Sequence, residues 1–600
     1  MRFHKSLSEI TLHIPKETYP SPRDWRDEIL YLIIVDRFSD GKESSRKLYE
    51  GAKDNESALY EDGGEKWRDS GLRWNGGTIR GIESKLDYLK GLGITTIWLT
   101  PVLRQRADFP QDIEETLQVN YHGYAIQNYL DVDPSFGTKE DLRELVKAAH
   151  DKDIRVILDV VHNHTGNNWY YKGYKGKHNL NVSPDYRDKG YEFGNWRTKS
   201  GNGVIKDDED GVFPIEFQNT DWYWKKGAIK HWDDYPEYEE GDFFESKSLK
   251  TSDQKVLDAL IKVYRYWIYF TDCDGFRLDA VKHVGLDASR KFCNAIREYA
   301  ELIGKKNFML MGEVAGSEDI AIKFLADTTS HGLNAVLDIN GPPRYLEKVI
   351  KGFEHPFELF KYYMPHSTLP LVSHREIGKF HISILDDQDQ VWRYPQEGKA
   401  RFCADNPFPQ QVVLATAFQL TSLGIPAIFY GTEQAFDGQG GPPHADRWIR
   451  ECMFGGEFGA KRTKGIHFFN PDNPIYKEIS KLCEIRKNEP ALRYGRQYFR
   501  QISYDGEKFG MPSAKQVIAW SRILAGEEIL IAINTSAESG NYVWVIVESE
   551  LHGENAKFEC LFSNSTTENP KYFKVTQKNT YKAVYIPLSA ASMCILKRKE

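Results

Sequence analysis

Short apolar runs alternate with amphipathic stretches through most of the chain. Eight runs are apolar on both faces and end in polar residues, which predicts buried strands at 31–38, 95–102, 156–161, 275–283, 308–314, 335–339, 380–385 and 425–430. Between them, apolar residues recur every three or four positions, which predicts helices at 81–90, after 138, and at 252–270, 286–303, 407–422 and 474–487. Alternating strands and helices indicate a parallel sheet, and eight repeats favour a (β/α)8 TIM barrel of the α/β class.

Three segments lack this alternation of strands and helices. Residues 165–250 are rich in aromatic residues, glycine, asparagine and aspartate and lack a helical period, so we expect an inserted domain after the third strand. From about residue 491, strands follow one another through turns, which favours a C-terminal antiparallel β-sandwich domain. The predicted division is a barrel of residues 1–164 and 251–490, an inserted domain of 165–250 and a β-sandwich domain of 491–600. Residues 39–73 have no clear period and are expected to form a surface loop.

The composition narrows the class of protein. Of the 600 residues, 40% are hydrophobic and 28% are charged, as in soluble globular proteins. The net charge of −8 gives no basic footprint for nucleic acid, and no apolar run of about 18 residues is available for a membrane span. The N-terminus lacks the apolar core of a signal peptide, and the seven scattered cysteines form no Cys-x-x-Cys pair. We therefore expect a cytoplasmic protein with reduced thiols.

Polar side chains collect at the ends of the predicted strands, where TIM barrels carry their active sites. They are Asp159, His162, Asn163 and His164 on the third strand, Arg277, Asp279, Lys282 and His283 on the fourth, Glu313 on the fifth, and Asp386, Asp387 and Asp389 on the seventh. Arg277 and Asp279 lie two positions apart and face one side of a strand, so the cation lowers the pKa of the carboxyl group and keeps it ionised.

Several carboxylates at one barrel mouth acquire separate pKa values, so that one is ionised while another carries a proton. Cleavage of a glycosidic bond requires this pair of states, with a nucleophile and an acid/base on opposite sides of the bond. An arginine–aspartate pair at a strand end is, by itself, more often structural. The function therefore has to be judged from the whole set of strand ends.

The motifs, taken together and in order, resemble those of the alpha-amylase family of glycoside hydrolases. The four main motifs are Asp159-Val-Val-His-Asn-His164, Gly275-Phe-Arg-Leu-Asp-Ala-Val-Lys-His283, Gly312-Glu313-Val314 and Leu385-Asp-Asp-Gln-Asp-Gln390. Further matches are Val35-Asp-Arg-Phe38, Tyr121-His-Gly-Tyr124 and Asp133-Pro-Ser-Phe-Gly-Thr138. The resemblance covers roughly residues 28–600. It implies a retaining enzyme that cleaves α-1,4-glucosidic bonds in an α-glucan such as starch, glycogen or a maltodextrin.

The resemblance also implies roles for single residues. Asp279 corresponds to the nucleophile, Glu313 to the general acid/base and Asp389 to the carboxylate that stabilises the transition state. The substrate-binding residues that it implies are Tyr124, His122, His164, Arg277, Lys282, His283 and Gln388. Tyr124 would stack under the sugar ring, and Lys282 with His283 would contact sugars on the leaving-group side. In a retaining enzyme the carboxyl groups of Asp279 and Glu313 should lie about 5–5.5 Å apart.

Structural calcium (Ca2+) is the cofactor that the resemblance implies. Asn163 corresponds to a residue that binds calcium in many family members, and calcium needs several oxygen ligands. The run Asp207-Asp-Glu-Asp210 in the insertion is a candidate for further ligands, although such a run is usually a solvated loop. The turn Gly76-Gly77-Thr78 lacks the aspartate that forms a second calcium site in some relatives.

Two other functions are compatible with the resemblance. A transglycosylase uses the same covalent intermediate but transfers the sugar to another sugar, and the difference lies in loop shape and water access. A catalytically silent family member would serve only for binding, and loss of the carboxylates would mark it. Asp279, Glu313 and Asp389 are all present here.

Gln388 departs from the family pattern, in which a histidine usually precedes the transition-state carboxylate. That histidine is expected to donate a hydrogen bond to a hydroxyl of the sugar being cleaved. Gln388 can donate through its amide but cannot carry a positive charge, and a neutral bond is roughly half as strong as a charge-assisted one. We expect either weaker stabilisation of the transition state or a cleft adapted to another sugar or linkage.

Overall fold

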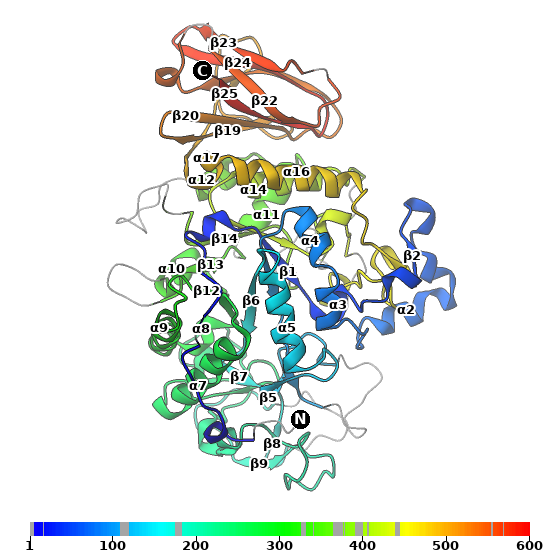
Figure 1. Ribbon diagram of the computed structural model, residues 1–600, viewed down its shortest axis with the longest axis vertical. Helices are drawn as coiled ribbons and strands as arrows, with labels where there is room; N and C mark the ends of the chain where they lie inside the picture. The colour runs from blue at the N-terminus through cyan, green and yellow to red at the C-terminus, as the bar shows by residue number, and fades with distance from the viewer. Residues whose placement is uncertain are drawn as a thin grey trace.

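The computed structural model describes residues 5–599 apart from 16, 108–118, 175–182, 326–331, 340, 364–375, 377, 390–399, 405–406, 439–444, 554–555 and 568. Its centre is a closed barrel of eight parallel strands (Figure 1). In spatial order these are β1 (Leu30–Ile33), β15 (Ile425–Phe429), β14 (His381–Ile384), β13 (Ala335–Leu337), β12 (Met309–Gly312), β11 (Gly275–Leu278), β6 (Arg155–Val160) and β3 (Thr96–Leu99). Because β1 pairs with both β3 and β15, the sheet has no edge, and the predicted barrel is confirmed.

Helices connect the barrel strands. In chain order they include α3 (Ile79–Glu83), α4 (Leu86–Leu92), α5 (Lys139–His150), α7 (Gln254–Thr271), α9 (Leu286–Leu302), α10 (Glu318–Phe324), α11 (Pro342–Ile350), α12 (Phe357–Tyr362), α14 (Gln411–Thr421) and α16 (Pro474–Asn488). The predicted helix at 81–90 is in fact two helices, because Lys85 leaves the helical conformation (φ −109°, ψ 7°). Helix α5 begins with a capping box between Thr138 and Asp141. Among the described helices, none is both long and apolar enough to cross a membrane.

Two predicted strands end earlier than the sequence indicated. Strand β1 ends at Ile33, and the helical turn α1 (Val35–Phe38) follows it. Its buried charges, Asp36 and Arg37, bond to backbone groups of residues 71–76. Strand β11 likewise ends at Leu278 and leads into α8 (Val281–Val284). In both cases a turn satisfies buried polar groups that a barrel strand would leave without partners.

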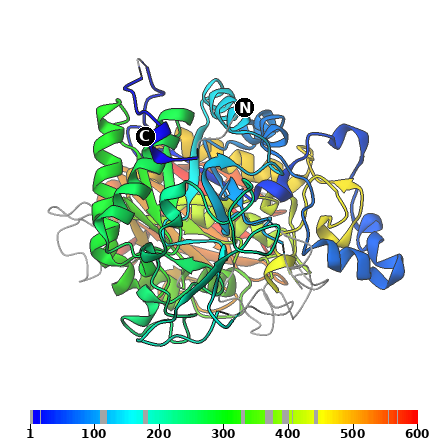
Figure 2. The same ribbon diagram turned by 90° about the horizontal axis from the view of Figure 1, so that it is seen from below.

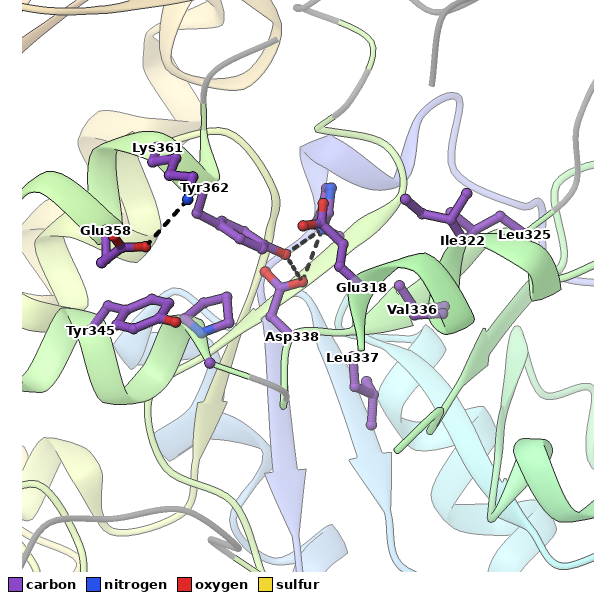
Figure 3. A pocket seen from close by; sticks show the side chains of 14 residues that line it. Glu318, Ile322, Leu325, Val336, Leu337, Asp338, Tyr345, Glu358, Lys361 and Tyr362 are labelled. Carbon is purple, nitrogen blue, oxygen red and sulfur yellow. Dashed lines mark hydrogen bonds and ion pairs between the residues drawn. The ribbon is translucent and has the colours of Figure 1, made fainter. Parts of the chain in front are cut away.

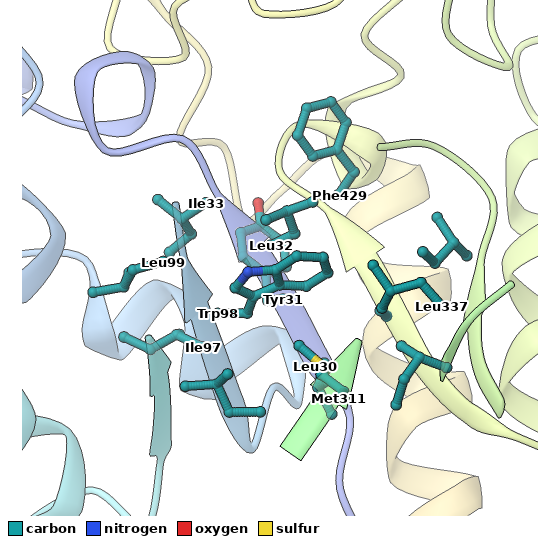
Figure 4. Packing of buried hydrophobic residues seen from close by; sticks show 14 of the residues in the cluster. Leu30, Tyr31, Leu32, Ile33, Ile97, Trp98, Leu99, Met311, Leu337 and Phe429 are labelled. Carbon is teal, nitrogen blue, oxygen red and sulfur yellow. The ribbon is translucent and has the colours of Figure 1, made fainter. Parts of the chain in front are cut away.

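Large apolar side chains from several strands pack together at the centre of the barrel (Figure 4). Leu30, Trp98, Met311 and Leu337 are each no more than 4% exposed and belong to one hydrophobic cluster. Full burial of such a side chain stabilises a fold by about 1.5–3 kcal/mol. The packed strands therefore form a rigid support for the side chains at their C-terminal ends.

The inserted segment leaves the barrel after β6 and returns before α7. It contains β7 (His164–Thr165), β8 (Trp169–Tyr171), β9 (Phe193–Trp196), α6 (Glu237–Glu240) and β10 (Lys247–Ser248). Strand β7 pairs with β10, so the segment starts and ends at the same place on the barrel. It lies at the opposite end of the molecule from the C-terminal domain (Figure 1). A second excursion pairs β4 (Leu103–Gln105) with β5 (Ile126–Val132).

A fully buried lysine lies inside the inserted segment. The Lys247 ammonium is 3.1 Å from the Asp242 carboxylate and donates to Ser183 Oγ at 2.6 Å. It also lies 5.1 Å and 4.8 Å from the ring centres of Trp169 and Tyr171. Only 2% of the Lys247 side chain is exposed. Burial lowers the pKa of this lysine, and the Asp242 charge opposes that effect.

Residues 39–73 were expected to be a surface loop, and that expectation is wrong. They contain β2 (Lys47–Leu48) and α2 (Glu65–Ser70), and β2 pairs with β16 (Ile466–His467). Trp67 stacks on Trp448 of α15 (Ala445–Trp448), with ring centres 5.4 Å apart. The segment stands out on the side away from α7 and α9 (Figures 1 and 2). Contacts with the segment after the last barrel strand hold it, and no sequence period reveals such contacts.

The C-terminal domain is antiparallel, as predicted, but its nine strands follow one another in a single hydrogen-bonded order. In that order they are β17 (Arg496–Phe499), β19 (Val517–Leu524), β20 (Glu527–Asn534), β25 (Met593–Lys599), β22 (Lys557–Ser563), β23 (Tyr572–Lys578), β24 (Tyr581–Leu588), β21 (Asn541–Val547) and β18 (Ile502–Ser503). Side chains from both halves of the order, such as Leu530 and Val584, share one hydrophobic core. The sheet therefore folds over on itself into two packed layers.

Two buried arginines join this domain to the barrel. Arg486 of α16 donates to the Leu420 carbonyl at 2.7 Å, and Arg522 of β19 donates to the Thr421 carbonyl at 2.6 Å. Both carbonyls belong to the last turn of α14, where the helix dipole is negative. Arg522 also donates to the carbonyl of Gly495, which directly follows the short helix α17 (Pro490–Tyr494). The two guanidinium groups thus connect α14, α16 and β19.

Candidate active site

Arg277 is the centre of the polar cluster at the barrel mouth. Its side chain is 1% exposed, and Nη1 donates to Asp159 Oδ1 at 2.9 Å and to Asp279 Oδ1 at 2.8 Å. Its Nη2 lies 3.0 Å from Glu313 Oε2. The three carboxylates come from the neighbouring strands β6, β11 and β12 or directly after them. One guanidinium therefore holds Asp279 and Glu313 beside each other.

The backbone after Asp279 also contributes to this arrangement. Ala280 has a left-handed conformation (φ 49°, ψ 41°), which is uncommon for a residue with a Cβ atom. Its N–H donates to Glu313 Oε2 at 3.2 Å. Such strain costs about 1–3 kcal/mol and persists only where the surroundings enforce it. Here the strained turn aims a backbone donor at the predicted acid/base.

Burial controls the protonation of the two carboxyl groups. It raises the pKa of Glu313 to about 7 and that of Asp279 to about 6, while Arg277 opposes both shifts. The sequence predicted that Arg277 would lower the pKa of Asp279 and keep it ionised. The cation has that effect, but loss of water around the carboxylate outweighs it. The shift toward higher pKa favours retention of a proton by Glu313, as its predicted role as acid/base requires.

Asp389 lies in the segment that follows β14. Its N–H donates to Asp387 Oδ1 at 2.7 Å, and its Oδ1 accepts from Arg450 Nη2 at 2.8 Å. Its charge raises the pKa of both Asp279 and Glu313, so the predicted third carboxylate faces the other two. Gln390, the last residue of the fourth motif, lies outside the described residues.

Tyr124 is bonded to several groups of the mouth. Its hydroxyl donates to Asp159 Oδ2 at 3.0 Å, and its backbone N–H donates to His122 Nδ1 at 3.1 Å. His164 Nε2 lies 3.2 Å from its carbonyl oxygen. Burial lowers the pKa of His122 to about 3 and that of His164 to about 4, so both imidazoles are neutral at neutral pH. A neutral sugar can bond to such groups without displacing a charge.

Lys282 and His283 connect the barrel to the inserted segment. Lys282 Nζ donates to the carbonyl of Trp232 at 2.8 Å and to Asp233 Oδ1 at 2.5 Å. His283 Nδ1 donates to the carbonyl of Tyr238 at 2.6 Å, and burial lowers its pKa to about 4. Their contact with sugars on the leaving-group side stays a prediction. The structure gives them a second role, because they hold residues 232–238 against α8.

Gln388 has a partner that the sequence did not indicate. It is 3% exposed, and its Nε2 donates to the Tyr124 hydroxyl at 3.2 Å. That hydroxyl gives its own proton to Asp159, which fixes the orientation of the amide. Gln388 Oε1 is buried and has no hydrogen-bond partner. The amide donor expected to bind substrate is therefore already in use.

Two residues of the mouth escaped the sequence reading. Trp98 Nε1 donates to Asp159 Oδ2 at 3.3 Å, and nothing distinguishes this tryptophan within its apolar strand. Arg450 belongs to no motif, and its role appears only from its contact with Asp389. Asp159 was noted at a strand end without a role. Burial raises its pKa to about 6, and Arg277 opposes that shift.

Of the residues predicted for a calcium site, Asn163 is compatible with a ligand role and the acidic run is not. Asn163 is 1% exposed, and its Oδ1 has no hydrogen-bond partner. A side-chain oxygen that binds a metal ion would look the same in a structure without the ion. The Asp210 carboxylate, however, accepts backbone N–H groups of its own loop, and Asp208 pairs with Arg104 at 3.0 Å. Within the described ranges, no group of three or more His, Cys, Asp or Glu side chains is placed to hold a metal ion. The acidic run thus caps its own loop and supplies no such site.

A cavity of about 270 Å³ lies between the strands β13 and β14 and the helices α10, α11 and α12 (Figure 3). Asp338, directly after β13, and His381, on β14, both line it. The His381 Nδ1 lies 2.9 Å from Asp338 Oδ1, and the Tyr362 hydroxyl donates to the same oxygen at 2.8 Å. None of the predicted site residues lines this cavity.

This histidine makes stability depend on pH. Burial disfavours the charged imidazole, but Asp338 outweighs it and raises the pKa of His381 above 6.5. Its contribution to stability is complete below the unfolded pKa of about 6.5 and is lost as pH rises through the folded value. As pH rises from about 6.5 through the folded pKa of His381, the free energy of unfolding should fall less in His381→Gln than in the wild type. Denaturant titrations from acid to alkaline pH measure this slope, with the exposed His355→Gln as control. An unchanged slope in His381→Gln would contradict the assignment.

Comparison with known proteins agrees with these features. The family model described as "Alpha amylase, catalytic domain" matches residues 32–466. The alpha-amylase of Streptomyces lividans is 27% identical over 518 residues, which cover 77% of this chain and 51% of that protein. A cyclomaltodextrin glucanotransferase of Klebsiella oxytoca is 26% identical over 513 residues, covering 80% of this chain and 67% of that protein. The chain thus spans about half the length of the Streptomyces relative.

Solved structures share the fold. The alpha-amylase from Geobacillus thermoleovorans complexed with acarbose has a TM-score of 0.64 at 23% identity and covers 96% of this chain and 100% of that one. The cyclomaltodextrin glucanotransferase CldA has a TM-score of 0.66 at 23% identity and covers 96% of this chain and 99% of that one. These likenesses concern the fold alone. Because the family model matches well over half of the residues, the chain belongs to the alpha-amylase family.

Proposed function

We propose that this protein is a retaining glycoside hydrolase that cleaves α-1,4-glucosidic bonds in starch, glycogen or maltodextrins. The observation that carries the proposal is the arrangement of three carboxylates at the barrel mouth. Asp279 and Glu313 share the Arg277 guanidinium, and Asp389 faces both. Family membership adds support, since its relatives include alpha-amylases.

In the proposed reaction, Glu313 gives its proton to the glycosidic oxygen while ionised Asp279 attacks the anomeric carbon. The bond to the leaving chain breaks, and a covalent glycosyl–Asp279 ester forms. Glu313 then takes a proton from water, and the resulting hydroxide displaces Asp279 and restores both groups. Asp389 stabilises the positive charge that develops on the sugar ring in each step.

Incubation with maltoheptaose and sizing of the products test the proposal. Shorter products alone indicate hydrolysis, and release of the α-anomer, followed by NMR, indicates retention. The absence of any change in chain length would support the silent, binding-only alternative. The same assay on a β-1,4-linked oligosaccharide provides the control for linkage.

Transglycosylation is the second candidate function. The relatives named cyclomaltodextrin glucanotransferases match this chain at 25–26% identity, close to the 25–27% of those named alpha-amylases. The ester on Asp279 would then react with a sugar hydroxyl in place of water. Products longer than maltoheptaose, increasing with substrate concentration, would identify this reaction.

Gln388→His tests the departure from the family pattern. We expect kcat/KM on maltoheptaose to rise by about tenfold if the imidazole recovers roughly 1.4 kcal/mol of transition-state stabilisation. The competing effect is loss of the bond from Gln388 Nε2 to the Tyr124 hydroxyl. Gln388→Leu can bond neither to the sugar hydroxyl nor to the Tyr124 hydroxyl. A kinetic comparison with this variant therefore separates the gain from the imidazole from the loss of the bond to Tyr124. An unchanged or lower kcat/KM in the histidine variant would show that the cleft is adapted to glutamine.

We also propose a cytoplasmic location. All seven cysteines are free thiols, and six of them are buried. This pattern is typical of proteins kept under reducing conditions. Cell fractionation of the native host tests the location, and recovery outside the cytoplasm would contradict it.

A further inference from the structure

Arg450 reaches the barrel mouth from the segment after β15. Its Nη2 donates to Asp389 Oδ1 at 2.8 Å, and its Nε donates to the backbone carbonyl of Gln388 at 2.9 Å. The side chain is 7% exposed. One planar group therefore binds both the carboxylate of Asp389 and the peptide unit that precedes it. This double contact fixes the direction of the carboxylate relative to its own backbone.

The barrel mouth holds more carboxylates than Arg277 can bind, so the contact between Arg450 and Asp389 adds a second cation to the cluster. Arg277 is shared by three carboxylates, namely Asp159, Asp279 and Glu313. The negative charge of Asp389 acts on Asp279 and Glu313 and disfavours their ionised forms by like-charge repulsion. Within the part of the chain that the structure describes, the titratable and charged groups that interact with Asp389 include His122, Tyr124, Asp279, Glu313, Asp387 and Arg450. Among these six groups, Arg450 is the permanent cation.

We propose that Arg450 is the positioning residue of Asp389, which it holds in one orientation while the sugar ring gains positive charge. The inference rests on the proposed function, in which Asp389 stabilises the transition state. Arg450 acts through Asp389 and makes no bond to the reacting atoms. It makes the segment after the last barrel strand part of the reaction, although no motif lies there.

Arginine suits this task better than lysine. Its guanidinium presents several donors in a rigid plane, so Nε and Nη2 reach two acceptors at once. A lysine at position 450 keeps the charge but offers a single flexible nitrogen. Arg450→Lys therefore separates the effect of charge from the effect of orientation, and Arg450→Ala removes both.

The experiment measures kcat and KM of both variants on maltoheptaose, with and without added guanidinium ion. We expect Arg450→Ala to lower kcat by about 100-fold with KM changed by less than about threefold, because transition-state stabilisation is lost and ground-state binding is kept. Arg450→Lys keeps the charge but not the double contact, so its kcat should lie between those of the wild type and Arg450→Ala. Added guanidinium ion should partly restore kcat in Arg450→Ala.

Arg462→Ala is the matched control, because it removes another mostly buried arginine ion pair from the same region, 2.9 Å from Asp437. We expect it to lower thermal stability without a comparable loss of kcat and without responding to guanidinium. The proposal is overturned if Arg450→Ala behaves like this control, or if its kcat is unchanged. Asp389→Asn, assayed in parallel, separates the two levels of inference. If Asp389→Asn is fully active, the proposed function fails. If it is inactive while Arg450→Ala has normal kinetics, only the role of Arg450 fails.

Discussion

Replacement of Asp279 by asparagine is expected to lower kcat on maltoheptaose by about 10⁴-fold or more, equivalent to roughly 5.5 kcal/mol of transition-state stabilisation. Asparagine has nearly the same shape, and its side-chain oxygen can still accept from Arg277 Nη1, as Asp279 Oδ1 does at 2.8 Å. An amide, however, is not a nucleophile that forms the glycosyl ester. Binding of maltoheptaose should persist, and isothermal titration calorimetry measures it. Wild-type turnover in this variant would refute the assigned role.

Glu313→Gln provides the matched comparison, because it removes the proton donor and leaves the nucleophile. We expect it to be severely impaired on maltoheptaose but much less impaired on α-maltosyl fluoride, whose leaving group needs no proton. Asp279→Asn should fail on both substrates. The opposite pattern, with Asp279→Asn active on α-maltosyl fluoride and Glu313→Gln inactive on both substrates, would show that the two carboxylates have each other's roles.

Lys247→Met is expected to destabilise the inserted segment by about 3–5 kcal/mol, the usual cost of breaking a buried ion pair by removing one partner. The Asp242 carboxylate is 1% exposed and would be left buried without the ammonium that lies 3.1 Å away. Tyr171 and Ser183 would still donate to it, but neither carries a positive charge. Hydrogen exchange and limited proteolysis of residues 165–250 measure the local free energy of unfolding.

Lys172→Met is the control for this variant. It removes a lysine of the same segment whose ion pair with Glu192 is 69% and 73% exposed, and exposed pairs contribute about 0–1 kcal/mol. The double variant Lys247→Met, Asp242→Asn removes both buried charges and should recover part of the loss. If Lys247→Met and Lys172→Met lowered the local free energy of unfolding equally, the buried ion pair would contribute no more to stability than the exposed one.

The sequence predicted secondary structure best where burial alone determines the choice of residues. Barrel strands are covered on both faces, so runs such as 425–430 are continuously apolar and easy to recognise. In the C-terminal domain, only four of nine strands were predicted. Strands such as β22 and β23 mix buried and exposed residues and offer no continuous apolar run. The early end of β1 also escaped prediction, because buried Asp36 and Arg37 need partners that only the folded chain supplies.

The candidate site divides in a similar way. Asp279 and Glu313 were found because they lie within motifs at strand ends, and the shared guanidinium agrees with that placement. The left-handed turn at Ala280 and the partner of Gln388 depend on three-dimensional contacts that no local pattern encodes. Arg450 meets Asp389 from 61 residues away. Pairs of this kind become visible only when the loops are placed.

The two arginines at the end of α14 mean that the C-terminal domain is not a detachable module. Helix α14 leads directly into β15, the strand that closes the barrel against β1. A gene fragment that stops at residue 466, where the family model ends, would lack both Arg486 and Arg522. The last carbonyls of α14 would then lose their buried donors at the point where the barrel closes. Recombination or truncation at that boundary would separate α14 from the arginines that bind its last carbonyls, so the barrel and the β-domain are expected to be inherited together.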